Sequence, residues 1–182
     1  GPLSGTSMAA PHVAGVAALL RSVSSASPST IRQTLIDSAQ PNGQLSGLMV
    51  SGGTVDAFEA IRSLDSDPPI LVATSPTNGA VGVPADTDIV LTFNEPVTVA
   101  GVASITIHRS EDGSVVETIP TAATLDPGES STQVTVNPVG DLPADTGIYV
   151  TVDPGAYSDL VGNPYAGISD ATALSFTTAD VG

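Results

Sequence analysis

The sequence contains no cysteine and few aromatic residues. The lack of cysteine excludes a disulfide scaffold, a thiol nucleophile and a thiolate metal site. Aromatic residues make up 3% of the 182 residues, so a core has to be built from Val, Ile, Leu and Ala. The roughly 18 consecutive apolar residues that a membrane-spanning helix needs are also missing. The apolar run from Val13 to Leu20 is too short, and no membrane span is expected.

Basic residues are scarce as well. Four Lys and Arg face nineteen Asp and Glu, which gives a formal net charge of −15. Such a surface repels phosphate backbones, so the sequence predicts no nucleic-acid partner. The charge suits a secreted or cell-surface protein that attracts divalent cations weakly, and plain solubility is the simpler explanation.

Residues 1–64 have the pattern of helices. From Met8 to Leu20 nearly every position is small or apolar, which is typical of a helix that is buried on all sides. A second helix is expected from Pro28, capped by Ser27, and a third over 55–63. The sequence shows no sheet to accompany these helices. We therefore expect this half to require a partner surface that it does not contain.

The pattern changes at a short acidic linker, residues 65–69. Over 70–179, apolar and polar residues alternate in short segments between turn signals. The expected strands lie within 88–97, 104–109, 115–119, 133–139, 147–154 and 173–178. Short strands with a turn about every ten residues predict an antiparallel β-sandwich.

The opening segment, SGTSMAAPHVAG over 4–15, places Ser7 at the start of the first expected helix. A nucleophilic Ser needs a general base, donors for the oxyanion and access for the substrate. The start of a helix offers unpaired N–H groups and the positive end of the helix dipole. By spacing alone, a Ser that caps a buried helix is the simpler interpretation.

The same dozen residues resemble the nucleophile motif of subtilisin-like serine proteases, the subtilases. Downstream, SPSTIRQTLIDSAQ resembles the helix that follows the nucleophile helix, and GLMVSGGTVDAFEAI resembles the segment that ends the catalytic domain. The second segment has Asp56 where that family usually has Asn. The resemblance covers residues 4 to about 64, so residues 1–64 are interpreted as the C-terminal, helical remnant of a subtilisin-like α/β catalytic domain.

This resemblance implies a secreted serine endopeptidase in which Ser7 attacks the peptide carbonyl and forms an acyl-enzyme. The backbone N–H of Ser7 is then one oxyanion donor. In the family the catalytic Asp, the catalytic His and the oxyanion Asn precede the Ser motif, and none of them is in this chain. We therefore expect the intact parent to cleave protein substrates without a cofactor. The chain alone, without the N-terminal part of the catalytic domain, is expected to be inactive.

Other titratable residues have simpler interpretations. His12 follows Ser7 by five positions on one helix and therefore points away from the Ser side chain, and in the family it belongs to the helix signature. His108 is expected to be an exposed strand residue. Asp37 and Asp56 are expected to be surface or capping groups.

Residues 68–179 resemble a bacterial Ig-like domain of the type found in S-layer proteins and in the C-terminal regions of secreted hydrolases. The similarity rests on SPTNG at 75–79, IVLTFNEPV at 89–97, YVTV at 149–152 and DLVGN at 159–163. Such domains act as spacers, folding partners, adhesion modules or substrate-binding modules. A second hypothesis is therefore that the Ig-like module acts at the cell surface and the protease remnant is incidental.

The Ig-like domain has two candidate ligands, calcium and carbohydrate. Calcium prefers oxygen ligands, and Asp153, Asp159, Asn163 and Asp170 lie near one loop region, although Asp-x-x-Gly-Asn is more simply a turn. A carbohydrate-binding face normally uses exposed aromatic rings, and the three tyrosines are the candidates.

Overall fold

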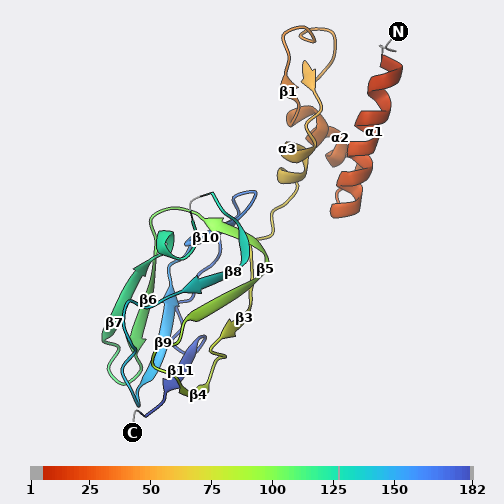
Figure 1. The fold of residues 1–182 in the computed structure, drawn as a ribbon. Coiled ribbons are helices and arrows are strands. Elements are labelled where there is room, and N and C mark those ends of the chain that lie inside the picture. The colour runs from red at the N-terminus through yellow and green to blue at the C-terminus, as the bar shows by residue number, and fades with distance from the viewer. Residues whose placement is uncertain (1–5, 127, 181–182) are drawn as a thin grey trace. The chain divides into compact units, whose positions relative to one another are not determined.

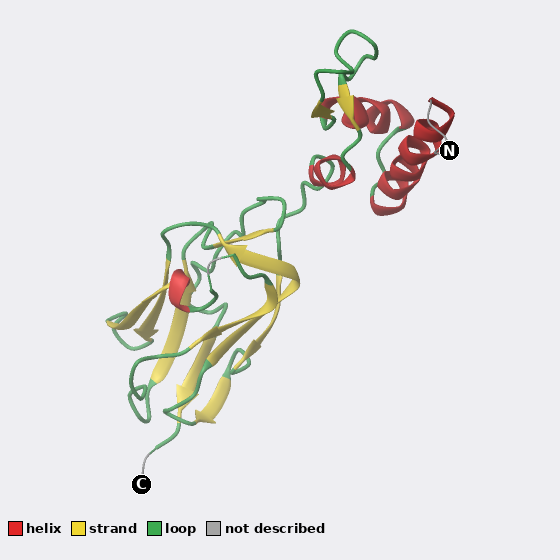
Figure 2. Ribbon diagram, turned by 45° about the horizontal axis from the view of Figure 1, so that its top comes forward, coloured by secondary structure: helices red, strands yellow, loops and turns green. Residues whose placement is uncertain are grey.

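The structure is a computed structural model that describes residues 6–126 and 128–180, with only the backbone of residues 6–8. The chain divides into two compact units, Gly1–Ser66 and Asp67–Gly182. Figure 2 shows that helices dominate the first unit and strands the second. The boundary lies within the acidic segment 65–69, where the sequence pattern changes.

The first unit consists of three helices and a two-stranded ladder (Figure 1). Its elements are α1 (Thr6–Val23), α2 (Pro28–Asp37), β1 (Gln40–Pro41), β2 (Gly53–Thr54) and α3 (Ala57–Arg62). The three expected helices are confirmed. The expectation of no sheet is wrong in one detail, because β1 and β2 pair antiparallel. Gly53 permits this pairing, since a Cβ atom there would collide with the carbonyl oxygen of Gln40.

Both α2 and α3 begin at side-chain caps. The Ser27 hydroxyl accepts a hydrogen bond from the Thr30 N–H at 3.1 Å, and Pro28 occupies the first turn, where its missing N–H costs least. Asp56 caps α3 by accepting from the Glu59 N–H at 3.0 Å. The capping role expected for Asp56 is confirmed, and Ser27 caps its helix as the sequence predicts.

In this chain α1 is not buried on all sides, which agrees with the expectation that this half requires a partner surface that it does not contain. Leu20 is fully buried, whereas Val13 and Leu19 are each 42% exposed. The buried core of the unit consists of Leu20, Ile31 and Ala60, and α1 adds Val16 and Ala17 to it from its C-terminal half. An apolar helix is buried only where a neighbouring layer covers it, and the first unit covers one end of α1.

The second unit is a sandwich of two sheets (Figure 1). The four-stranded sheet contains β3 (Leu71–Ser75), β5 (Ile89–Val99), β8 (Ser131–Val136) and β10 (Tyr157–Asp159). The five-stranded sheet has the order β4 (Ala80–Val83), β11 (Ser175–Thr178), β9 (Gly147–Val152), β6 (Ser104–Arg109) and β7 (Val115–Pro120). A single 3-10 turn, η1 (Thr121–Ala123), follows β7. The β-sandwich is confirmed, but it is not purely antiparallel, because β11 pairs with β4 in parallel.

Alternation along the sequence predicted the strands that line the core. The expected segments appear as β5, β6, β7, β8, β9 and β11, and their apolar positions are buried, for example Ile89, Leu91 and Phe93 of β5. Sequence reasoning missed β3, β4 and β10. The first two each pair on one side only and expose at least half of their residues, whereas β10 is buried at all three positions. None of the three alternates cleanly between apolar and polar residues.

Among the described residues, the sandwich encloses one continuous hydrophobic core of twenty buried residues, whereas the hydrophobic core of the helical unit consists of three. Phe93 lies in an aromatic group within it, with ring centroids 5.7 Å from Tyr157 and 5.1 Å from Tyr165. The Tyr157 hydroxyl lies 2.7 Å from the Thr124 hydroxyl. Burial raises the pKa of both tyrosines to about 12. The second unit therefore has the core that an independently folded domain requires.

The buried tyrosines predict a loss of stability in strong alkali. Unfolded tyrosine ionises near pH 10, whereas folded Tyr157 and Tyr165 have a pKa of about 12. The stability of the second unit is therefore retained below pH about 10 and falls as the pH rises towards 12, because the unfolded chain releases its protons first. Urea unfolding followed by circular dichroism across this range measures the effect.

Tyr165→Phe keeps the ring and removes one ionising hydroxyl, so it should make the alkaline decline shallower. Tyr149→Phe, at a half-exposed position of β9, is the matched control for loss of a phenol hydroxyl. An equal decline in the wild type and in Tyr165→Phe would contradict the role assigned to burial.

Candidate functional site

Ser7 lies in the first turn of α1, which begins at Thr6. Its side chain lies outside the described residues, so the nucleophilic role stays a prediction. The first N–H groups of a helix have no intrahelical acceptor, and the helix dipole adds partial positive charge there. Pro11 lies inside α1 and has no N–H to donate to the Ser7 carbonyl four positions earlier. The free N–H groups and the dipole at this end of α1, rather than the freed carbonyl, suit a group on which negative charge develops.

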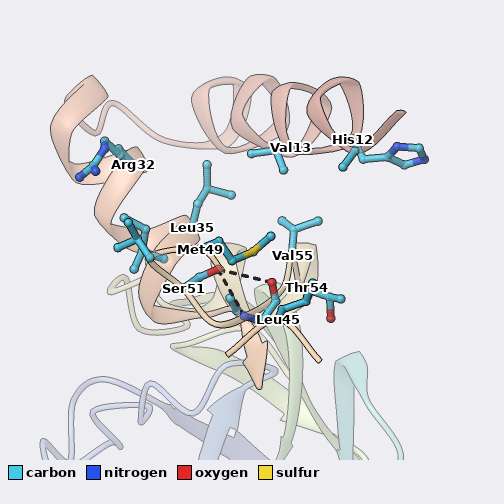
Figure 3. A pocket seen from close by; sticks show the side chains of 14 residues that line it. His12, Val13, Arg32, Leu35, Leu45, Met49, Ser51, Thr54 and Val55 are labelled. Atoms are coloured by element: carbon cyan, nitrogen blue, oxygen red, sulfur yellow. Dashed lines mark hydrogen bonds between the residues drawn. The ribbon is translucent and has the colours of Figure 1, made fainter. Parts of the chain in front are cut away.

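His12 lies on a different side of α1 from Ser7. Five positions on a helix correspond to a rotation of about 140°. The exposed His12 side chain lies at one end of an apolar pocket, as Figure 3 shows. This position argues against His12 as the general base for Ser7.

The pocket lies beneath α1 and has a volume of about 510 Å³ (Figure 3). Val13 extends into it from α1, and Leu35, Met49 and Val55 line the opposite side. A second pocket of about 430 Å³, also lined by Leu35, lies between α1 and α2. The two pockets share Leu35 and Arg32, and we call them together the α1–α2 groove. Sequence reasoning predicted a buried helix here and missed the groove, because periodicity does not reveal which layer is absent.

The loop after β10 is organised by the carboxylate of Asp159, which is only 3% exposed. One oxygen accepts hydrogen bonds from the N–H groups of Val161, Gly162 and Asn163 at 2.9, 2.6 and 2.8 Å. The other oxygen accepts from the Asn163 side-chain amide at 2.8 Å. The turn interpretation of Asp-x-x-Gly-Asn is therefore confirmed.

The other members of the predicted calcium set are engaged in separate turns. Asp153 accepts from the Ser104 N–H at 2.9 Å. Asp170 accepts from the N–H and the hydroxyl of Thr172, and these two bonds lower the pKa of its carboxyl group. Within the described part of the chain, Asp153 and Asp170 join no group of three potential ligand atoms within 4.8 Å of one another. Calcium takes six to eight oxygen ligands, and these residues do not assemble such a set.

The tyrosines do not form a shared binding face. Tyr157 and Tyr165 are 0% and 6% exposed in the core, which leaves Tyr149 on the outer side of β9. Two of the only three tyrosines available for a carbohydrate-binding face are therefore buried, which adds to the sequence argument against that ligand. The Tyr149 ring stacks on His108 of β6, with centroids 4.5 Å apart and planes at 5°.

The prediction that His108 is exposed is also wrong, because the residue is half-buried. Its Nδ1 lies 3.3 Å from the Gly113 carbonyl oxygen, which can only accept, so this nitrogen is the donor. Its Nε2 lies 3.0 Å from the Thr151 hydroxyl. Both ring nitrogens and one ring face are engaged within the sheet, and His108 is thereby explained as a structural residue.

Asp159→Asn is expected to destabilise the second unit by about 1–3 kcal/mol, because it replaces charge-assisted hydrogen bonds in a buried loop. It also places a new side-chain amide beside the Asn163 amide, which donates to Asp159 in the wild type. Asp170→Asn is the matched control at an exposed turn and should change the free energy of unfolding much less than Asp159→Asn does. Urea unfolding with chelator and with added calcium measures both variants. An unchanged Asp159→Asn, or a loss seen only with calcium present, would contradict the assignment to the loop.

The two packed sheets and the enclosed core define the second unit as an Ig-like β-sandwich. Residues 65–178 match the family model described as bacterial Ig-like domain, and the chain belongs to this family. Residues 1–60 match the model described as the subtilase family, and this match includes Ser7, α1 and α2.

A search of solved structures finds copper-protein and S-layer chains among its matches. CopC from Methylosinus trichosporium OB3b is 18% identical, with 63% of this chain and 96% of that chain covered and a TM-score of 0.44. PcoC, a copper resistance protein from Escherichia coli, is 25% identical, with 60% and 98% covered and a TM-score of 0.38. The N-terminal part of the bacterial S-layer protein SbsC is 15% identical, with 82% and 38% covered and a TM-score of 0.40. These scores are too low to support an inference about ligands.

A search among curated proteins finds no significant match. Among the helices that the described residues form, none combines the length and apolar character that a membrane crossing requires.

Proposed function

We propose that the chain is part of a secreted subtilisin-like serine endopeptidase that carries an accessory Ig-like domain. The observation that supports this most directly is the subtilase match over residues 1–60, in which Ser7 stands in the first turn of α1. The acidic charge and the membership of a bacterial Ig-like family are in keeping with a secreted or cell-surface location.

In this proposal Ser7 is the nucleophile. Its Oγ attacks the peptide carbonyl while a His from the preceding part of the catalytic domain takes the hydroxyl proton. The backbone N–H of Ser7 stabilises the oxyanion, and the helix dipole favours the same charge. The protonated His then gives its proton to the leaving amine, and water hydrolyses the acyl-enzyme by the same route in reverse. No metal or organic cofactor takes part in this sequence of steps.

The chain by itself lacks a group that could act as the base. His12 lies about 140° around the helix from Ser7. His108 has both ring nitrogens engaged with Gly113 and Thr151 of the second unit. Together these are the two histidines of the sequence. We therefore propose that activity requires the part of the catalytic domain that supplies the His, the Asp and the oxyanion Asn.

Labelling with a fluorophosphonate probe tests the role of Ser7. The 182-residue chain should show no labelling, because an unactivated Ser hydroxyl does not react at a useful rate. The longer gene product should be labelled stoichiometrically at Ser7, and Ser7→Ala should abolish the label. Ser4→Ala is the control for a neighbouring hydroxyl and should leave labelling intact. Stoichiometric labelling of the short chain, or labelling that survives Ser7→Ala, would refute the proposal.

A second candidate function belongs to a different class. In the part of the chain that the structure describes, the hydrophobic core of the sandwich has twenty buried residues and that of the helical unit has three. This contrast favours the Ig-like module as a unit that folds by itself and acts as a cell-surface spacer or adhesion domain. On this view the protease segment is incidental. The preceding gene sequence discriminates the two, because a protease requires an Asp in a D-[ST]-G context and a His in H-G-T-H.

Limited proteolysis tests whether the two units differ in stability as their cores indicate. A resistant product that begins near Asp67 and keeps its β-sheet circular dichroism is expected, while residues 6–66 are degraded. The exposed Leu48, Met49 and Val50 give an early cleavage site, because exposed loop residues reach a protease without unfolding. Protection of the helical unit with rapid loss of the sandwich would contradict this reading.

A further inference from the structure

Two Asn-Gly sequences lie in turns of this chain, and the fold holds them differently. Asn42-Gly43 follows β1 in the helical unit, and Asn78-Gly79 precedes β4 in the sandwich. Because glycine has no side chain beside its nitrogen, the backbone nitrogen of an Asn-Gly pair can approach the Asn side-chain amide and attack it. The product of this attack is a cyclic imide. Its formation in a folded chain requires that the nitrogen and the amide are free to meet.

The Gly43 nitrogen is free to react. Within the described part of the chain no hydrogen bond engages the Gly43 N–H. The Asn42 carbonyl oxygen accepts from the Leu45 N–H at 2.8 Å, so Gly43 lies at the corner of a turn. Apart from its chain neighbours, nothing lies within 4 Å of the point where a Cβ atom of Gly43 would be. The nitrogen can therefore change its orientation without breaking a bond or displacing another segment.

The Asn42 side chain is already held in a favourable orientation by the same turn. Its Oδ1 accepts a hydrogen bond from the Gln44 N–H at 3.0 Å, which is the arrangement of an Asx turn. Attack on Cγ places negative charge on this Oδ1, and a donor already directed at the oxygen stabilises that charge. No hydrogen bond holds Nδ2, the leaving group, among the described residues. The turn therefore favours the reaction at both the oxygen and the leaving group.

The fold restrains both reacting groups of Asn78-Gly79. The Gly79 N–H donates to the Ser175 carbonyl oxygen at 2.7 Å. The Asn78 Nδ2 donates to the Thr172 carbonyl oxygen at 2.9 Å, and its Oδ1 accepts from the N–H and the hydroxyl of Ser175 at 2.9 and 3.0 Å. Attack would require these bonds to a distant segment to break first. Asn78 is therefore protected for as long as the sandwich stays folded.

We propose that Asn42 is a site of spontaneous deamidation and that the fold protects Asn78 from the same reaction. The Gly43 nitrogen loses its proton to water and bonds to Cγ of Asn42. The Cγ–Nδ2 bond breaks, and Nδ2 takes up a proton and leaves as ammonia. Water then opens the cyclic imide at one of its carbonyl carbons and gives aspartate or isoaspartate at position 42. This chemistry needs no other reagent and is independent of the proposed protease function.

The modification changes the structure next to the β1–β2 ladder. The Asn42 N–H donates to the Gly52 carbonyl oxygen at 3.0 Å, beside the paired residues Pro41 and Gly53. Isoaspartate carries the backbone through the side-chain methylene, so it lengthens the chain at this point and weakens the pairing. Both products also add one negative charge to a chain of net charge −15. The modified chain should therefore bind an anion exchanger more tightly than the unmodified one.

Peptide mapping by mass spectrometry tests the proposal on the whole chain after incubation in mildly alkaline buffer. The peptide with Asn42 should gain the mass that accompanies exchange of an amide for a carboxyl group, and an isoaspartate methyltransferase should label part of it. The peptide with Asn78 should stay unchanged. In concentrated urea the conversion of Asn78 should rise to a rate similar to that of Asn42, because unfolding removes the bonds that restrain it.

Two glycine variants assign the reaction to the Gly43 nitrogen. Gly43→Ala should slow the conversion of Asn42 several-fold, because a Cβ atom hinders the approach to Cγ. Gly140→Ala is the matched control and should leave the rate unchanged. Both glycines have open space for a Cβ atom and a φ outside the left-handed region, so neither change strains the backbone. An Asn42 that stays intact, equal conversion of Asn42 and Asn78 in the folded chain, or an unchanged rate in Gly43→Ala would overturn the proposal.

Discussion

Burial of apolar side chains between two facing layers decides how each unit of this chain is built. In the sandwich, the inward residues of both sheets meet in one core, and twenty side chains are withdrawn from water. In the helical unit, α1 has apolar residues around its circumference, but neighbouring helices cover only its C-terminal half. Apolar side chains are therefore covered by a second layer in the sandwich but only partly covered in the helical unit. The α1–α2 groove lies where the covering layer is absent.

The exposed face of α1 bears on the proposed role of Ser7. A nucleophile is effective only when its backbone is held rigidly, because small displacements from the productive geometry are costly to the reaction rate. Ser7 stands at the end of α1 that has the least cover, and Pro11 removes one of the hydrogen bonds that would steady that end. A surface that covers Val13 would hold this turn. In the proposed protease, packing against α1 and positioning of Ser7 would therefore depend on the same surface.

Much of the fold could be predicted from the sequence, and the exceptions have physical reasons. Alternation located β5 and β9, and the Ser27 and Asp56 caps located two helix starts, because these signals are local. The short strands β3, β4 and β10 lack alternation and form only because β5 and β11 offer them partners. His108 was expected to be exposed, and only the stacking on Tyr149 across neighbouring strands shows otherwise. Cross-strand neighbours of this kind depend on register, which a single segment does not reveal.

The sequence by itself determined the two-part pattern, the acidic surface, the sandwich and the subtilase-like setting of Ser7, because composition, periodicity and motif are properties of short stretches. Only the tertiary structure decided which side chains are buried or hydrogen-bonded within the fold and are therefore unavailable to a ligand. It placed Tyr157 and Tyr165 in the core and engaged both ring nitrogens of His108 within the sheet. It also placed Arg32 beside an apolar groove. Each of these depends on contacts between segments distant in the chain, and such contacts exist only once the layers have packed.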